Sequence, residues 1–268
     1  MLSACANNTD HPEILEGNKS NTLNGTGYVF FIPSQISHQF LRQECVPGKK
    51  VLEIGSGFGD LPIEALQNGV SEYYANDISN EHLEILLRKV KLKVATRMDN
   101  IKILSGKAPD ILRSVSEKFD AILADKVIHF FTPNEIKKFL KQAKSLLKSG
   151  GKLYISVASP YSKKYCGVLN EYLDKKKRGD AFPGYFTDIM SRLNQHQDVD
   201  KNYPNYAVPN AMVLFARTDL IKLIKNNGMK VEVSYSLKIP TKDNPEWLEC
   251  LDEESNLAGV IAINVEGL

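Results

Sequence analysis

The chain contains the sequence Val51-Leu52-Glu53-Ile54-Gly55-Ser56-Gly57-Phe58-Gly59-Asp60, in which a short apolar run precedes three glycines at alternate positions. The run predicts a buried strand, and Pro62 lies where the first turn of a helix tolerates proline. A ligand approaches the backbone closely only where no Cβ intervenes, and glycine adopts the positive φ values of a tight turn. The first N–H groups of the helix face the same turn. We therefore predict a strand, a ligand-holding turn and a helix.

The flanking sequence repeats this alternation of strands and helices. Further strands are predicted at 73–77, 101–104, 119–124 and 152–157, and apolar residues at helical spacing lie between them. Five such strands in about a hundred residues favour a parallel sheet covered on both faces. Residues 229–237 and 257–265 alternate as two more strands, which we expect to pair antiparallel. The predicted fold is α/β, a doubly wound, mostly parallel seven-stranded sheet with an antiparallel C-terminal strand.

Three parts of the chain are distinguished by composition. Residues 1–46 form an N-terminal arm and helix, because a polar stretch is followed by a helix start at Pro33-Ser34. Residues 47–268 form the α/β domain. Its regular pattern stops at Pro160 and resumes at Thr218, the expected cap of the next helix. We therefore expect an insertion at 160–217, after the fifth strand and on the substrate side.

The composition limits the possible partners and compartments. Lys and Arg number 34 against 32 Asp and Glu, a formal charge of +2, which does not favour nucleic acid as the partner. No apolar run approaches the roughly 20 residues of a membrane span, so we expect no membrane partner. The four cysteines are scattered without a C-x-x-C pair, so no metal site or disulfide framework is predicted. This fits a cytoplasmic protein. Nothing in the composition sets the oligomeric state.

The spacing of the glycines separates two cofactor classes. A dinucleotide fingerprint needs its third glycine at position 60, where Asp60 stands and would repel a pyrophosphate. The pattern E-x-G-x-G-x-G suits a ligand that presents an amino acid group to the turn. Together with Asp77 at the end of the second strand, it resembles the class I S-adenosylmethionine-dependent methyltransferases. The resemblance covers residues 47–158 closely and residues 218–265 in outline.

This resemblance implies S-adenosylmethionine as the cofactor, S-adenosylhomocysteine as its product, and a role for each matching residue. The loop under the methionine moiety would be formed by Glu53, Gly55, Ser56, Gly57 and Gly59. Asp77 would accept hydrogen bonds from both ribose hydroxyls, since a carboxylate offers two acceptor oxygens. Ile78 would pack on the adenosine, Ala108 would lie at the adenine edge, and Asp125 would contact or position the cofactor.

Candidates for catalysis and acceptor binding follow from position. His129 lies after the fourth strand and titrates near neutral pH, so it is a candidate general base; its alternative role is packing. Tyr28, next to two glycines, is a candidate lid residue; its alternative place is an edge strand or turn. The insertion is rich in aromatic residues, among them Tyr161 and Tyr185, which either wall an acceptor pocket or form a small core of their own. Residues 175–178 are basic, either an RNA contact or a solvated helix end.

Three functional hypotheses remain open from the sequence. The leading one is methyl transfer from S-adenosylmethionine to oxygen or nitrogen of a small molecule. The second is a methyltransferase whose acceptor is protein or RNA. The third is a non-catalytic partner subunit that binds S-adenosylmethionine. A nicotinamide-dependent oxidoreductase is disfavoured by Asp60.

Overall fold

The computed structural model describes residues 19–194, 209–238, 248–252 and 255–267. The first 18 residues of the predicted arm lie outside this part, as do two aromatic residues of the predicted insertion, Tyr203 and Tyr206. Within the described residues, no helix combines the length and apolarity that a membrane crossing requires.

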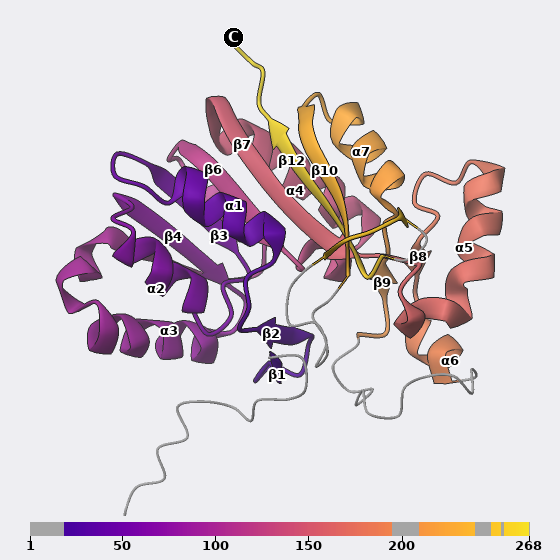
Figure 1. The fold of residues 1–268 in the computed structure, drawn as a ribbon, viewed down its shortest axis with the longest axis horizontal. Coiled ribbons are helices and arrows are strands. Elements are labelled where there is room, and N and C mark those ends of the chain that lie inside the picture. Colours follow the sequence, from indigo (N-terminus) through magenta and orange to yellow (C-terminus); the bar gives the residue numbers. More distant parts are fainter. Residues whose placement is uncertain (1–18, 195–208, 239–247, 253–254, 268) are drawn as a thin grey trace, which may run out of the picture.

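The centre of the fold is one mixed sheet (Figure 1). Its strands lie in the order β11 (Leu248–Glu249), β10 (Lys230–Lys238), β12 (Leu257–Ile263), β7 (Leu147–Ala158), β6 (Phe119–Asp125), β3 (Lys50–Ile54), β4 (Glu72–Asp77) and β5 (Ile101–Ser105). From β5 to β7 all neighbours are parallel, whereas β12 is antiparallel to both β7 and β10. The predicted sheet of seven strands with an antiparallel C-terminal strand is confirmed, and the two-residue β11 extends its edge.

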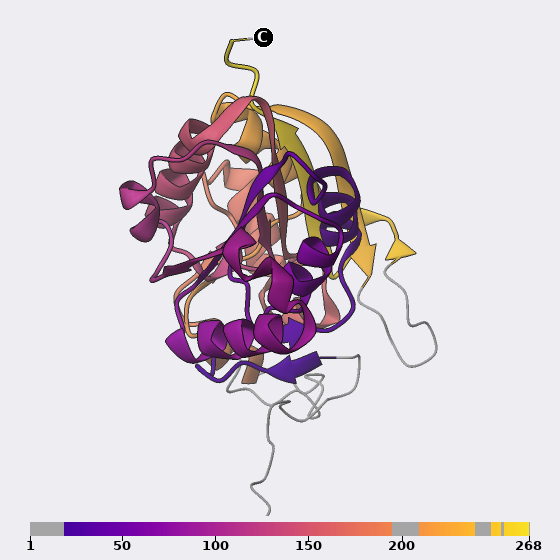
Figure 2. The ribbon, with the colours of Figure 1, turned by 90° about the vertical axis from the view of Figure 1, so that its left-hand side faces the viewer.

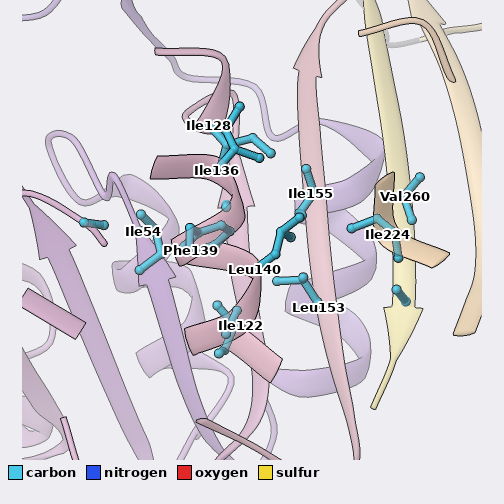
Figure 3. Packing of buried hydrophobic residues seen from close by; sticks show 14 of the residues in the cluster. Ile54, Ile122, Ile128, Ile136, Phe139, Leu140, Leu153, Ile155, Ile224 and Val260 are labelled. Carbon is cyan, nitrogen blue, oxygen red and sulfur yellow. The ribbon is translucent and has the colours of Figure 1, made fainter. Parts of the chain in front are cut away.

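Helices cover both faces because residues along each strand alternate between them. The helices α1 (Gln35–Glu44), α2 (Asp60–Gln67) and α3 (Asn80–Lys93) pack with Val51, whose face continues through Ala121. The helices α4 (Pro133–Leu146) and α7 (Arg217–Asn226) pack with Leu52 and Ile122 (Figures 2 and 3). Figure 3 shows Phe139 and Leu140 of α4 directed at the strands.

Helix starts agree with the capping patterns in the sequence, with one exception. The side chains of Ser34, Ser79 and Thr132 accept backbone N–H groups at the starts of α1, α3 and α4. The predicted cap Thr218 is wrong: α7 begins at Arg217, and its N-cap is Ala216, two residues before Thr218. The Thr218 hydroxyl instead accepts a hydrogen bond from Lys176. The strand β7 also begins at Leu147, before the glycine pair that was expected to end the helix.

Short 3₁₀ helices complete the connections of the sheet. They are η1 (Ala95–Asn100), η2 (Ile111–Ser114) and η3 (Ile128–Phe130). The last of these follows β6 directly and places its residues at the carboxyl ends of the parallel strands.

Two smaller units lie beyond the carboxyl ends of the parallel strands. The first is the hairpin of β1 (Lys19–Asn21) and β2 (Tyr28–Phe30), which lies below the sheet in Figure 1. The second consists of η4 (Lys163–Tyr165), α5 (Cys166–Arg178), β8 (Tyr185–Phe186), α6 (Ile189–Asn194) and β9 (Met212–Val213). This second unit has its own buried cluster, which contains Val168 and Tyr172.

Candidate functional site

The glycine turn between β3 and α2 has the backbone that its sequence requires. Gly55, Gly57 and Gly59 have φ values of +74°, +54° and +80°. The N–H groups of Gly55 and Ser56 both donate to the carbonyl oxygen of Asn76 at 2.8 Å. These bonds tie the turn to the end of β4, so the glycine turn and Asp77 form one rigid unit.

The three glycines meet different neighbours. A Cβ on Gly55 would lie 2.4 Å from Val127 Cγ2, and one on Gly57 would lie 3.0 Å from Val29 Cγ2. A Cβ on Gly59 would lie 2.1 Å from Leu86 Cδ1. Gly59 is therefore a site of close packing between α2 and α3. It is not among the residues that form the wall of the cavity described next.

A cavity of about 1010 Å³ lies at the carboxyl ends of the parallel strands, where open α/β sheets bind their ligands. Ten of the residues singled out from the sequence form part of its wall: Tyr28, Glu53, Gly55, Ser56, Gly57, Asp77, Ile78, Ala108, Asp125 and His129. The structure thus brings together residues from five separate segments. The volume of the cavity is at the upper end of the range for small-ligand sites, and it leaves room for a cofactor and an acceptor side by side.

Asp77 is buried and its carboxylate has several backbone partners. Its Oδ2 accepts the N–H of Gly57 at 2.9 Å, and its Oδ1 accepts the N–H of Ser79 at 2.8 Å. His82 Nδ1 lies 3.1 Å from the same Oδ1. A carboxylate has about four lone-pair positions, so acceptor capacity remains for a ligand hydroxyl. Next to it, the side chain of Ile78 is 58% exposed and offers an apolar surface to a planar ring.

Glu53 is the buried carboxyl group at the floor of the cavity. Burial, together with the negative charges of Asp125 and Asp77, raises its pKa to about 8, although the hydroxyl of Tyr73 donates to it at 2.8 Å. The group is therefore mostly protonated at pH 7 in the absence of a ligand. A cationic ligand group beside it would favour the ionised form.

Asp125 and Lys126 form a largely buried ion pair at the end of β6. The hydroxyl of Ser37 donates to Asp125 Oδ2 at 2.8 Å, and that of Ser156 donates to Oδ1. Burial opposes ionisation of Asp125, but the charge and hydrogen bonds of Lys126 and these two hydroxyls outweigh it, so its pKa is lowered. The Lys126 ammonium also lies 5.1 Å from the ring centroid of Phe30 in the hairpin. Lys126 is the one non-glycine residue among those described with positive φ, at 60°.

His129 lies in the cavity wall but has the properties of a packing residue. Burial and the positive charges of Lys164 and Lys126 lower its pKa to about 3. The N–H of Ala158 donates to its Nδ1 at 3.4 Å, and its ring packs on Phe130. A group with this pKa is a weak base at neutral pH, so the geometry does not favour the catalytic role considered for His129.

The sequence predicted only some of the residues that line the acceptor side of the cavity. Tyr161 packs against Tyr172, and Tyr185 packs against the main core, so these two candidate acceptor residues lie outside the wall. In their place the cavity is lined by aromatic and basic residues, Phe30, Phe31, Phe130, Phe131, Tyr165, Lys126, Lys163 and Lys164. Most of these residues follow the ends of strands or precede α1. The sequence indicated those positions but did not show which side chains face the cavity.

Three residues of the basic run at the end of α5 form ion pairs with neighbouring carboxylates of α5, of α7 and of the turn after α5. Lys175 pairs with Glu171 at 2.8 Å, Lys176 with Asp219 at 3.1 Å, and Arg178 with Asp180 at 3.2 Å. None of the run is among the described residues of the cavity wall. This arrangement is that of a paired helix end.

The residues present fit the proposed cofactor in charge and shape. S-adenosylmethionine carries an ammonium and a sulfonium group, and the wall on the glycine side contains the carboxyl groups of Glu53, Asp77 and Asp125. The buried hydroxyl of Ser56 has no hydrogen-bond partner among the described residues, and it lies in the same wall. A buried polar group of this kind is satisfied by a ligand or by water.

The family described as "Methyltransferase domain" matches residues 51–151, the part that contains the glycine turn, Asp77 and Asp125. This match assigns a methyltransferase domain to residues 51–151. Solved structures of this fold hold S-adenosylhomocysteine or S-adenosylmethionine.

Two relatives that are similar in sequence are methyltransferases, and their names give different substrates. The chain is 27% identical over 152 residues to the ribosomal protein L11 methyltransferase of Streptococcus equi subsp. zooepidemicus, covering 55% of this chain and 40% of that protein. It is 30% identical over 110 residues to a probable cobalt-precorrin-6B C(15)-methyltransferase of Saccharolobus solfataricus, covering 40% and 52%. The chain thus matches about half or less of these relatives' own length.

A solved structure gives the same fold. Magnesium protoporphyrin IX methyltransferase from Synechocystis, crystallised with bound S-adenosylhomocysteine, aligns with a TM-score of 0.51 at 18% identity, over 85% of this chain and 79% of that one. At this identity the likeness concerns the fold of the methyltransferase domain.

The raised pKa of Glu53 predicts a pH-dependent affinity. Binding of S-adenosylhomocysteine, whose ammonium favours the ionised carboxylate, should expel a proton wherever free Glu53 is protonated, that is, below about pH 8. Affinity should therefore rise between pH 6 and 7.5, by up to about tenfold per pH unit. Calorimetry in buffers of different ionisation enthalpy measures the released proton. Glu53→Gln should abolish both the release and the slope, and an unchanged slope in that variant would assign the proton elsewhere.

Proposed function

We propose that the chain transfers a methyl group from S-adenosylmethionine to an oxygen or nitrogen atom of a small-molecule acceptor. The observation that carries the proposal is the cavity, which joins the glycine turn and its carboxylates to a second wall of aromatic and basic side chains. The hairpin and the α5–α6 unit both contribute to that second wall, through residues such as Tyr28 and Tyr165. Aromatic walls of this kind suit a planar acceptor.

The proposed reaction needs positioning more than acid catalysis. S-adenosylmethionine supplies an activated methyl group on a sulfonium sulfur. The acceptor atom forms the new bond to the methyl carbon as the sulfur–carbon bond breaks, and S-adenosylhomocysteine leaves without protonation. Orientation of the two partners then accounts for much of the rate enhancement. Asp77, Glu53 and the glycine turn would hold the cofactor for this step.

The acceptor must lose a proton if it binds as an alcohol or ammonium group. With a pKa of about 3, His129 is poorly suited to remove it at neutral pH. The side chains of Lys126, Lys163 and Lys164 line the cavity. Their positive charges lower the free energy of binding a negatively charged acceptor there. We propose that the acceptor binds already deprotonated, or loses its proton to water.

Two alternative functions are less well supported by the structure than this proposal. A protein or RNA acceptor, as the name of the L11 relative implies for that relative, would be supported by a basic rim. Lys175, Lys176 and Arg178 of the basic run are instead paired with acidic residues and lie outside the cavity wall. A non-catalytic subunit would bind the cofactor without turnover. The aromatic second wall supports an acceptor site and hence catalysis.

The test is transfer of label from methyl-labelled S-adenosylmethionine into a cell extract that has been separated by size, with an Asp77→Ala variant as the control. Label in the small-molecule fraction that is lost in the variant is the expected result. Label in protein or RNA would contradict the proposal of a small-molecule acceptor and support a macromolecular one. Cofactor binding with no label in any fraction would support the non-catalytic subunit.

A further inference from the structure

His82 is a buried polar residue on α3 that the proposed chemistry does not use. Its side chain is 2% exposed, and it lies between the hairpin and the end of β4. The N–H of Leu23, in the turn between β1 and β2, lies 3.1 Å from His82 Nε2. On the other side of the ring, His82 Nδ1 lies 3.1 Å from Asp77 Oδ1. One imidazole therefore contacts two segments that are far apart in the sequence.

The two contacts fix the tautomer of the ring. A backbone N–H can only donate, so Nε2 must accept the bond from Leu23 and carries no proton. The proton of the neutral ring then resides on Nδ1, which donates to the carboxylate of Asp77. The N–H of Leu23 thus donates to His82, and His82 donates to Asp77. Asp77 itself also accepts the N–H of Gly57, so the series ends in the glycine turn.

The ring is held in place by packing. The ring of Phe58 meets that of His82 edge-on, with centroids 5.1 Å apart and an interplanar angle of 78°. The ammonium of Lys89 lies 5.9 Å from the centroid of Phe58 and pairs with Asp60 at 2.9 Å. The ring of His82 is thus packed against Phe58 of the glycine turn, which in turn lies beneath Lys89 of α3.

The hairpin held by this bond covers the cofactor side of the cavity. Val29 packs against Gly57, where a Cβ would lie 3.0 Å from its Cγ2, and Phe130 packs against Gly27 at a corresponding distance of 2.9 Å. Figure 1 shows β1 and β2 below the end of the sheet, close to α3. A hairpin displaced from this position would remove Tyr28 and Val29 from the wall.

We infer that His82 is a positioning residue that couples the order of the β1–β2 hairpin to the carboxylate of Asp77. This inference rests on the proposed role of Asp77 in binding the ribose. The ring orients the carboxylate toward the ligand and anchors the hairpin over it. Because coupling between two sites is reciprocal, a ligand on Asp77 stabilises the hairpin, and an ordered hairpin strengthens binding of the ligand.

The test uses three substitutions of His82 and one control. His82→Phe keeps the ring and removes both bonds. His82→Gln places an amide near Nε2 and restores an acceptor for Leu23, whereas His82→Asn places one near Nδ1 and restores a donor for Asp77. His38→Phe alters an exposed histidine on α1 and serves as the matched control. Circular dichroism establishes which variants are folded before they are compared.

Two readouts separate the two halves of the inference. The first is amide hydrogen exchange of residues 19–30 in the protein without ligand, with and without the substitutions. His82→Phe should exchange the Leu23 amide about tenfold faster, and His82→Gln should restore slow exchange. The second is the dissociation constant of S-adenosylhomocysteine. It should rise about tenfold in His82→Phe and be largely restored in His82→Asn. In the wild type the ligand should slow exchange across the hairpin, and in His82→Phe it should not.

Unchanged exchange at Leu23 in His82→Phe, or equal ligand protection of the hairpin in both proteins, would overturn the inference. A wild-type protein that fails to bind S-adenosylhomocysteine would instead contradict the proposed function and would overturn the coupling to the ligand. The exchange data on the ligand-free variants would still report on the bond between His82 and the hairpin, so the two failures are distinguishable.

Discussion

Asp77→Asn should weaken binding of S-adenosylhomocysteine by about 100-fold, because the substitution removes the charged carboxylate whose remaining acceptor position would bind a ribose hydroxyl. It also places an N–H₂ group against one of three donors, the N–H groups of Gly57 and Ser79 or the ring of His82. The glycine turn and the ribose site are therefore disturbed together. Isothermal titration calorimetry with S-adenosylhomocysteine measures the effect.

The control for this substitution is Asp174→Asn on the exposed side of α5, which removes the same charge away from the cavity. Its dissociation constant should equal that of the wild type. If Asp77→Asn binds within about threefold of the wild type, Asp77 does not hold the ribose, and the residue roles implied by the resemblance are wrong at this position.

Asp125→Ala should lower the free energy of unfolding by about 3–5 kcal/mol, the usual cost of leaving a buried charge without its partner. The side chains of Asp125 and Lys126 are 11% and 14% exposed, and the hydroxyls of Ser37 and Ser156 would lose their acceptor as well. Urea denaturation followed by circular dichroism measures the difference. The loss should also remove the hydrogen bond through which Ser37 joins α1 to the end of β6.

The pH dependence of this loss follows from the lowered pKa of Asp125. A carboxyl group with a lowered pKa in the folded state contributes stability above its ordinary pKa near 4, and this contribution disappears as the pH falls through the folded value. Wild type and Asp125→Ala should therefore differ fully at pH 7 and converge only in acid. The control is Asp110→Ala, whose partner Arg113 lies 3.6 Å away with both side chains more than 60% exposed. It should cost under about 1 kcal/mol, and an equal loss in both variants would refute the account of Asp125.

The fold could be predicted because its signals are local and repeated. Each strand is an apolar run bounded by turn residues, and the caps Ser34, Ser79 and Thr132 stand directly before apolar periodicity. Thr218 is the second residue of α7, not its cap, and its hydroxyl accepts a hydrogen bond from Lys176 of α5, a contact that local sequence does not show. The added strand β11 is only two residues long, below the length at which alternation is recognisable.

The candidate site was predictable on one side only. The glycine turn and Asp77 have spacings that local backbone chemistry dictates, and the structure places them in one wall. The opposite wall is assembled from segments whose inward-facing residues depend on tertiary packing. Tyr161 and Tyr185 were as suitable as Tyr165 in composition, but the former two pack elsewhere. The low pKa of His129 depends on burial and on Lys164, which lies 35 residues further along the chain, so position after a strand did not reveal it.

The bond between His82 and Leu23 illustrates the same limit. In sequence, His82 is an inconspicuous residue in the first turn of a helix, and Leu23 lies in a polar stretch without apolar period. Only the fold brings the hairpin turn to the ring, 59 residues away in the chain. Polar contacts of this kind are specified by tertiary structure and are the part of a site that sequence patterns convey least.

The most direct measurement of the central claim is equilibrium dialysis of the purified chain against radiolabelled S-adenosylmethionine, with S-adenosylhomocysteine and NAD as competitors. The account predicts one bound S-adenosylmethionine per chain, displaced by S-adenosylhomocysteine and unaffected by NAD, because Asp60 opposes a pyrophosphate at the turn. Absence of binding, or displacement by NAD at the same site, would contradict it.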